Sequence, residues 1–174
     1  MSFERIGGRT VWEGRIATVR VDSFRYEDGE EAEREIVAHP GSVAVVAFDG
    51  RHLFLVRQPR EPVNEPALLE LPAGKLDEDG EDPLDTAKRE LAEEVGKGAR
   101  TWRHLTSFYT SPGFADEECH LYLATDLRDE PAEAPEEERI EIVEVPLEDL
   151  DQLIQECRDA KSVVGLLWFK AYLA

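Results

Sequence analysis

The sequence predicts an α/β (α+β) fold, an α/β/α sandwich around a mixed β-sheet, preceded by a small antiparallel β-arm. Three observations predict it: strand-like apolar segments between residues 43 and 145, one strongly capped helix among them, and two helical segments at the end of the chain. The chain has 174 residues, of which 41% are hydrophobic, which suits one core with a small appendage.

The first 40 residues are expected to form the arm. They contain strand-like segments, separated by a turn at 27–29: residues 11–13, 16–26 and 32–39. These segments are charged on one face and thinly apolar, so they cannot build a core alone. We expect the arm to pack on the main domain or on a second subunit, which predicts a homodimer. The His39-Pro40-Gly41 break predicts two domains, 1–40 and 41–174.

The main domain begins with a continuous apolar strand at 43–48, and Asp49-Gly50 is a hairpin signal. Further strands are expected at 52–57, 68–72, 106–110, 120–125 and 140–145. Loops rich in proline and charge separate some of them, at 58–66 and 129–139. Two helices, 147–160 and 162–173, are expected to close the chain.

The most informative segment runs from Gly74 to Gly96 and reads G-K-L-D-E-D-G-E-D-P-L-D-T-A-K-R-E-L-A-E-E-V-G. Asp82 followed by Pro83 is typical of a helix start, and Gly96 is typical of a helix stop. An apolar stripe recurs at helical spacing between them, formed by Leu84, Ala87, Leu91 and Val95.

Three glutamates crowd one side of this helix. Glu90 and Glu94 lie one turn apart, and Glu93 borders the same face. Like charges at this spacing cost a few tenths of a kcal/mol each in an isolated helix. A divalent cation reverses that sign, because hard cations bind several carboxylate oxygens. The alternative is a solvated acidic face, which an acidic chain makes plausible. The metal site is the sharper prediction, and its natural substrate is a phosphate ester or anhydride.

The same segment resembles the Nudix box, G-x5-E-x7-R-E-U-x-E-E-x-G-U with U apolar. The matching positions are Gly74, Glu81, Arg89, Glu90, Leu91, Glu93, Glu94 and Gly96. Two departures stand out: six residues separate Gly74 from Glu81, and Lys97 occupies the last apolar position. The extra residue precedes the helix and leaves its register intact. The resemblance implies the Nudix sandwich over most of residues 41–173.

Features outside the box resemble the ADP-ribose pyrophosphatase branch of that family. Ser111-Pro112-Gly113-Phe114 places a proline sixteen residues after Gly96, and the segments 56–60 and 69–74 are also similar. This resemblance implies hydrolysis of ADP-ribose to AMP and ribose 5-phosphate with two or more Mg²⁺ ions, or Mn²⁺. Two alternatives stay open. One is hydrolysis of another nucleoside diphosphate derivative, such as a dinucleoside polyphosphate or an oxidised nucleotide. The other is a non-catalytic nucleotide sensor, which the intact box glutamates and the lack of a basic extension disfavour.

The residues divide into expected roles. The metal ligands are Glu90, Glu94 and Glu93, joined by resemblance by the backbone carbonyl of Ala73. Arg89 is expected to orient the glutamates. The resemblance implies that the catalytic base is Glu138 or Glu136, the alternative being that these glutamates belong to a solvated acidic loop. It also implies a set of substrate-binding residues: Arg60, Arg57, Ser111, Gly113 and Glu117. For Arg57 a strand-end salt bridge is an equal alternative. The resemblance implies an adenine slot built by the arm and a partner subunit, with Phe24, Tyr26 and Trp12 as candidate walls or, alternatively, as ordinary core residues.

Composition limits the other classes of function. The formal charge of −19 argues against binding of nucleic-acid backbones, which needs a basic surface. The sequence contains no run of about 18 apolar residues, so no membrane span is predicted. The N-terminus has no signal-peptide pattern. Cys119 and Cys157 are isolated thiols without metal spacing, as in a reduced cytoplasmic protein.

Overall fold

The computed structural model describes residues 1–76, 80–130, 132 and 139–173. The chain divides into two compact units. The smaller unit comprises Met1–Gly41 and Tyr109–Glu118, and the larger comprises Ser42–Phe108 and Cys119–Ala174. Among the described residues, none of the helices has the length and apolar character needed to cross a membrane.

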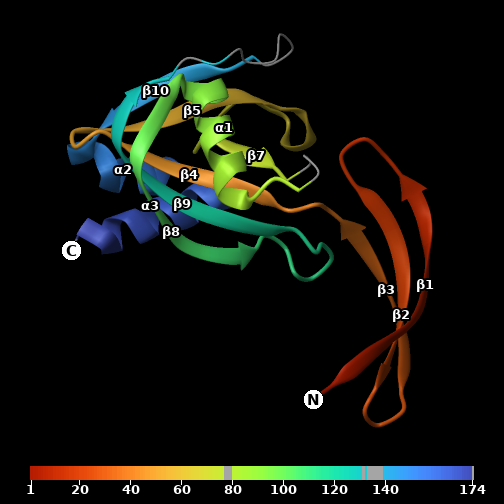
Figure 1. The fold of residues 1–174 in the computed structure, drawn as a ribbon. Helices are drawn as coiled ribbons and strands as arrows, with labels where there is room; N and C mark the ends of the chain where they lie inside the picture. Colours follow the sequence, from red (N-terminus) through yellow and green to blue (C-terminus); the bar gives the residue numbers. More distant parts are fainter. Residues whose placement is uncertain (77–79, 131, 133–138, 174) are drawn as a thin grey trace. The chain divides into compact units, whose positions relative to one another are not determined.

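The larger unit is built on a seven-stranded sheet (Figure 1). Its strands are β4 (Ser42–Phe48), β5 (His52–Arg60), β6 (Glu65–Glu70), β7 (Ala73–Lys75), β8 (Lys97–Tyr109), β9 (Glu118–Asp129) and β10 (Glu141–Pro146). Five of them lie in the order β10-β5-β4-β9-β8, while β6 pairs with β5 and β7 with β4. Because β4 is parallel to β9 and antiparallel to β5, the sheet is mixed, as predicted.

Helices cover both faces of this sheet (Figure 1). Successive residues of a strand point to opposite faces. Val43 and Val45 therefore join the cluster under α1 (Pro83–Val95), whereas Ala44 and Val46 join the cluster under α2 (Leu150–Glu156) and α3 (Ala160–Leu173). Burial on both sides explains why β4 reads as a continuous apolar run. The predicted α/β/α sandwich is confirmed.

The smaller unit is a three-stranded antiparallel sheet of β1 (Phe3–Glu13), β2 (Thr18–Tyr26) and β3 (Glu31–Ala38). The 109–118 segment joins it through a bridge between Val37 and Ala115. Every residue of β1 is exposed, and the one fully buried side chain among the strands is Asp22 of β2. The predicted antiparallel sheet at the N-terminus is confirmed. Because its strands bury little, the sequence of residues 1–40 has few apolar positions.

Two strands are longer than the sequence indicated. The first begins at Phe3 rather than residue 11, and two register shifts along it break the alternation that would reveal a strand. The strand after the central helix begins at Lys97 rather than residue 106. It lies at the end of the sheet order, where exposed arginines such as Arg100 and Arg103 are tolerated.

Other observed element boundaries differ from the predicted ones because of local backbone chemistry. β5 continues to Arg60 through Pro59, with a register shift that accommodates the missing N–H. The predicted helix 147–160 is instead a 3₁₀ turn, Leu147–Asp149, followed by the short α2. The last helix begins at Ala160 rather than residue 162, because Asp159 caps it by accepting a hydrogen bond from the Ser162 N–H.

Candidate active site

The register of α1 is fixed at both ends as the sequence predicted. The Asp82 carboxylate accepts a hydrogen bond of 2.9 Å from the Leu84 N–H, and Pro83 is the first helical residue. Gly96 ends the helix with a left-handed φ of 69°, which favours glycine. The apolar side, including Ala87 and Leu91, is buried against the sheet. The acidic residues are thereby held on the remaining sides of the helix.

Glu94 and Glu90 both border Ala73 and Gly74, the first two residues of β7, where the chain turns into that strand after Pro72. The Ala73 N–H donates to Glu94 Oε2 at 2.9 Å, and Glu94 is only 6% exposed. A Cβ at Gly74 would overlap the carboxylate of Glu90, so that side chain lies directly against the Gly74 backbone. Two carboxylates one helical turn apart therefore meet a single dipeptide.

Arg89 binds three carboxylates, two on α1 and one just before it. Its Nη1 lies 2.9 Å from Glu90 Oε1 and 3.1 Å from Glu93 Oε2, and its Nη2 lies 3.2 Å from Glu81 Oε2. Burial lowers the pKa of Arg89, but the hydrogen bond to Glu81 and the surrounding carboxylate charges outweigh it and raise that pKa above its ordinary value. The guanidinium therefore stays charged and fixes the directions of three carboxylates.

A second arginine–glutamate pair is formed by Arg60, at the end of β5, and Glu70, at the end of β6. Arg60 binds Glu70 through two hydrogen bonds, Nε to Oε1 at 2.6 Å and Nη2 to Oε2 at 2.8 Å, and the Glu70 side chain is 1% exposed. The bond to Glu70 raises the pKa of Arg60, burial opposes it, and the charges of Glu94 and Asp159 add to the rise. Arg60 therefore lies within electrostatic range of the Glu94 carboxylate.

Sequence reasoning missed Glu70. The signal was present, because a glutamate inside the apolar run Leu68-Leu69-Glu70-Leu71 is buried only when it is paired. Arg57 instead faces the exposed Glu141 at 3.7 Å, which is the strand-end ion pair left open as its alternative.

The donors at the turn are all oxygens, from carboxylates and the Ala73 carbonyl, and such a set fits a hard divalent cation such as Mg²⁺ or Mn²⁺. Within the described part of the chain, no three His, Cys, Asp or Glu side chains lie close enough together to hold a metal ion. The chemistry of the donors fits a cation, while Arg89 occupies oxygens of Glu90 and Glu93.

The remaining predicted residues lie elsewhere. Glu136 and Glu138 are outside the described residues. Ser111, Gly113 and Glu117 belong to the smaller unit. There the Ser111 carbonyl accepts from the Phe114 and Ala115 N–H groups at 3.1 and 2.9 Å, and Glu117 accepts from the Thr110 hydroxyl at 2.8 Å.

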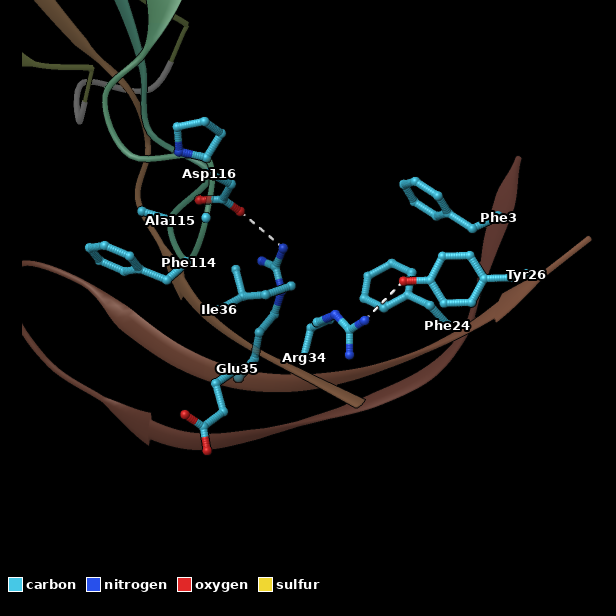
Figure 2. A pocket seen from close by; sticks show the side chains of 12 residues that line it. Phe3, Phe24, Tyr26, Arg34, Glu35, Ile36, Phe114, Ala115 and Asp116 are labelled. Carbon is cyan, nitrogen blue, oxygen red and sulfur yellow. Dashed lines mark hydrogen bonds and ion pairs between the residues drawn. The ribbon is translucent and has the colours of Figure 1, made fainter. Parts of the chain in front are cut away.

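The smaller unit contains a pocket of about 340 Å³ (Figure 2). Aromatic rings line it, from Phe3, Phe24, Tyr26 and Phe114. Arg34 donates to the Tyr26 hydroxyl at 3.0 Å (Figure 2), and Arg20 donates to Asp116 at 2.9 Å. Two of the expected aromatic walls line this pocket, but Trp12 does not. The Trp12 ring lies over Gly14, where a Cβ would meet it.

Known proteins resemble this chain in sequence and in fold. A model of the NUDIX domain matches residues 38–165. An ADP-ribose pyrophosphatase of Bacillus subtilis (strain 168) is 41% identical over 95% of this chain and 91% of that protein. A methanol dehydrogenase activator of Bacillus methanolicus is also 41% identical, over 92% of this chain and 88% of that protein. An ADP-ribose pyrophosphatase of Mycobacterium tuberculosis (strain ATCC 25618 / H37Rv) is 46% identical over 73% of this chain and 61% of that protein.

A solved structure agrees with these relatives. The crystal structure of an ADP compounds hydrolase superposes with a TM-score of 0.87 at 26% sequence identity, covering 99% of this chain and 95% of that chain. Together with the capped acidic helix, these matches establish the class: the chain belongs to the Nudix family of hydrolases. Nudix hydrolases generally use divalent metal ions, in agreement with the oxygen donors around Ala73.

Proposed function

We propose that this protein is a Mg²⁺-dependent ADP-ribose pyrophosphatase that produces AMP and ribose 5-phosphate. The observation that carries the proposal is the meeting of Glu90 and Glu94 at Ala73 and Gly74, with Arg60 within electrostatic range of Glu94. The names of the Bacillus subtilis and Mycobacterium tuberculosis relatives support ADP-ribose as the substrate. Mn²⁺ is the expected substitute for Mg²⁺, and two or more ions are expected.

In pyrophosphate hydrolysis, water attacks one phosphorus and charge develops on the surrounding oxygens, so positioned cations supply most of the stabilisation. Bound Mg²⁺ would neutralise that charge. The ligands of the Mg²⁺ ions would be Glu90, Glu94, Glu93 and the Ala73 carbonyl. The Ala73 N–H keeps Glu94 directed at the turn, and Arg89 keeps Glu93 from rotating freely. Arg60, held by Glu70, would bind a phosphate through its remaining N–H groups.

The attacking water also needs a base. We assign this role to Glu138 or Glu136, because a carboxylate can accept the proton when it lies within hydrogen-bond reach of the water. The remaining substrate contacts are assigned to Arg57, Ser111, Gly113 and Glu117. The pocket with Phe24 and Tyr26 has aromatic walls of the chemistry that an adenine ring requires.

A homodimer is part of the same proposal. Residues 1–40 would be the dimerising arm and residues 41–174 the hydrolase domain. The support is β1, whose large apolar side chains are exposed: Phe3, Ile6, Val11 and Trp12. A cytoplasmic location accords with its two cysteines, which are both free thiols. The acidic surface makes nucleic acid an unsuitable partner, since a formal charge of −19 repels phosphate backbones.

Hydrolysis tests the proposal directly. The purified protein should convert ADP-ribose to AMP and ribose 5-phosphate with Mg²⁺, and EDTA should abolish the reaction. A parallel panel should contain GDP-mannose, a dinucleoside polyphosphate and an oxidised deoxynucleoside triphosphate. Preference for one of these over ADP-ribose would keep the Nudix hydrolase but replace the substrate. No turnover of any compound, with nucleotide still bound, would favour a sensor.

A further inference from the structure

Ser162 is a buried polar residue on α3, with 0% of its surface exposed. Its helix neighbours on the same face, Gly165, Leu166 and Phe169, all pack in the apolar core. A buried hydroxyl is costly unless it is hydrogen-bonded. Ser162 is bonded twice: its Oγ donates to Asp159 Oδ2 at 2.7 Å and accepts from the Leu71 N–H at 2.7 Å.

The directions of these two bonds are fixed by the chemistry of the partners. An ionised carboxylate accepts only, and a backbone N–H donates only. Asp159 therefore takes the single Ser162 proton, and the Ser162 oxygen is left to accept from Leu71. The Asp159 carboxylate is held in turn by the Ser162 N–H at 2.9 Å and by Lys161 at 3.3 Å. Asp159 thus orients the hydroxyl toward a residue 91 positions away in the sequence.

Leu71 lies in a short strap, residues 70–73, between the end of β6 and the start of β7. Leu71 is 1% exposed, and its N–H would otherwise be buried without a partner. The rest of the strap is bound from other elements: the Pro72 carbonyl accepts from the Val45 N–H at 2.9 Å, and the Ala73 N–H holds Glu94. At its first residue, Glu70 holds Arg60. One short segment therefore connects α3, β4, the acidic helix and the arginine.

We propose that Ser162, oriented by Asp159, is a positioning residue of the catalytic centre: it fixes the 70–73 strap and thereby the Ala73 carbonyl, Glu94 and Arg60. The inference rests on the proposed function for its catalytic consequence. The position of the strap itself does not depend on that function. Polar partners that orient a ligand-bearing element typically change metal affinity or activity by about 10- to 100-fold when they are removed.

The test compares Ser162→Ala with Val164→Ala. Val164 packs partly buried against the same core from the same helix, so its truncation loosens α3 without removing a hydrogen bond. Three quantities are measured: amide hydrogen exchange at Leu71 and Ala73 by NMR, Mn²⁺ affinity by EPR without substrate, and kcat and KM for ADP-ribose.

Ser162→Ala should speed exchange of the Leu71 and Ala73 amides by about tenfold or more, weaken Mn²⁺ binding by about 10- to 100-fold and lower kcat more than it raises KM. Val164→Ala should lower the melting temperature without selecting these two amides and with Mn²⁺ affinity unchanged. Ser162→Thr, which keeps the hydroxyl, should restore Mn²⁺ affinity toward that of the wild type.

Wild-type exchange at Leu71 together with wild-type Mn²⁺ affinity in Ser162→Ala would overturn the inference. Equal effects of Ser162→Ala and Val164→Ala would overturn it as well, since they would mean that Ser162 only stabilises the helix. If Ser162→Ala does not fold, Asp159→Asn replaces it; weaker changes are expected in the same three quantities, and their absence would also overturn the inference. A wild-type protein that cleaves no ADP-ribose, but whose Ser162→Ala variant shows the exchange effect, would refute the proposed function and leave the strap assignment intact.

Discussion

Both units bury carboxylates, and Asp22 of the smaller unit and Glu94 of the larger unit differ in their surroundings. In the smaller unit, Asp22 is bound by two arginines, with Arg5 Nε and Arg20 Nε both 2.8 Å away. In the larger unit, Glu94 accepts from a backbone N–H and lies one helical turn from a second acid, Glu90, which Arg89 binds at 2.9 Å. Two acids one turn apart on a helix offer the oxygen donors that a divalent cation prefers. An acid held between two arginines does not.

Glu94→Gln tests whether Glu94 is a metal ligand. The amide oxygen can still accept from the Ala73 N–H, so the fold should survive, but a metal-binding charge is lost. Metal stabilisation of a developing phosphoryl charge is worth several kcal/mol, so kcat should fall by about a thousandfold or more. Steady-state hydrolysis of ADP-ribose, with circular dichroism as the check on folding, measures it.

The matched control is Glu148→Gln, which removes an equal charge from an exposed position at the start of the C-terminal helical region. Its rate should stay within about twofold of the wild type, because exposed charges away from the site contribute little. A Glu94→Gln enzyme of near-normal rate would remove the metal assignment and make Glu94 a structural acid like Asp22.

Features set by neighbouring residues could be predicted from the sequence, whereas interactions between distant residues could not. The acidic helix could be read in detail, because Asp82, Pro83 and Gly96 are local signals whose effect does not depend on distant residues. The sandwich followed from the apolar pattern of β4. The sequence could not identify the partners of Glu70 and Ser162, which are Arg60 and Leu71. These interactions join residues 10 and 91 positions apart. The start of β1 was missed because its register shifts and full exposure leave no alternation to detect.

Gly74→Ala tests how closely the turn and the acidic helix fit together. The added Cβ would occupy the place of the Glu90 carboxylate, and that side chain would have to turn away from the Ala73–Gly74 dipeptide. A small displacement of a catalytic group can cost about 100-fold in rate, so kcat/KM should drop by about 10- to 100-fold. The melting temperature should change little, since the displaced group is the end of a flexible side chain.

Gly7→Ala is the control for Gly74→Ala, because a Cβ at Gly7 meets nothing within 4 Å. It should leave kcat/KM unchanged. If Gly74→Ala proved as active as Gly7→Ala, the Glu90 carboxylate would not need its place on the turn, and its role as a metal ligand would have to be abandoned.

The smallest expected effect on activity, and the sharpest on local stability, concerns Asp22. The hydrogen bond from Arg5 lowers the pKa of Asp22, burial opposes this, and Arg20 lowers it further, so the net shift is downward. A lowered carboxyl pKa contributes stability above the unfolded value of about 3.9, and this contribution is lost as pH falls through the folded value. Protection factors of β2 amides should therefore drop as the solution is acidified below about pH 4.

Asp22→Asn should remove this pH-dependent part. At pH 7 its β2 protection factors should be about tenfold lower than in the wild type, and the difference should shrink as the wild-type Asp22 becomes protonated. Glu4→Gln is the comparison, since Glu4 is exposed and pairs with Arg25 at 3.2 Å on the surface of the same sheet, where such pairs contribute little. If Glu4→Gln and Asp22→Asn lowered the β2 protection factors equally, the ion pairs of Asp22 with its two arginines would contribute no more than an exposed surface pair. The contrast between Asp22, bound by two arginines, and Glu94, one helical turn from Glu90, would then rest on α1 alone.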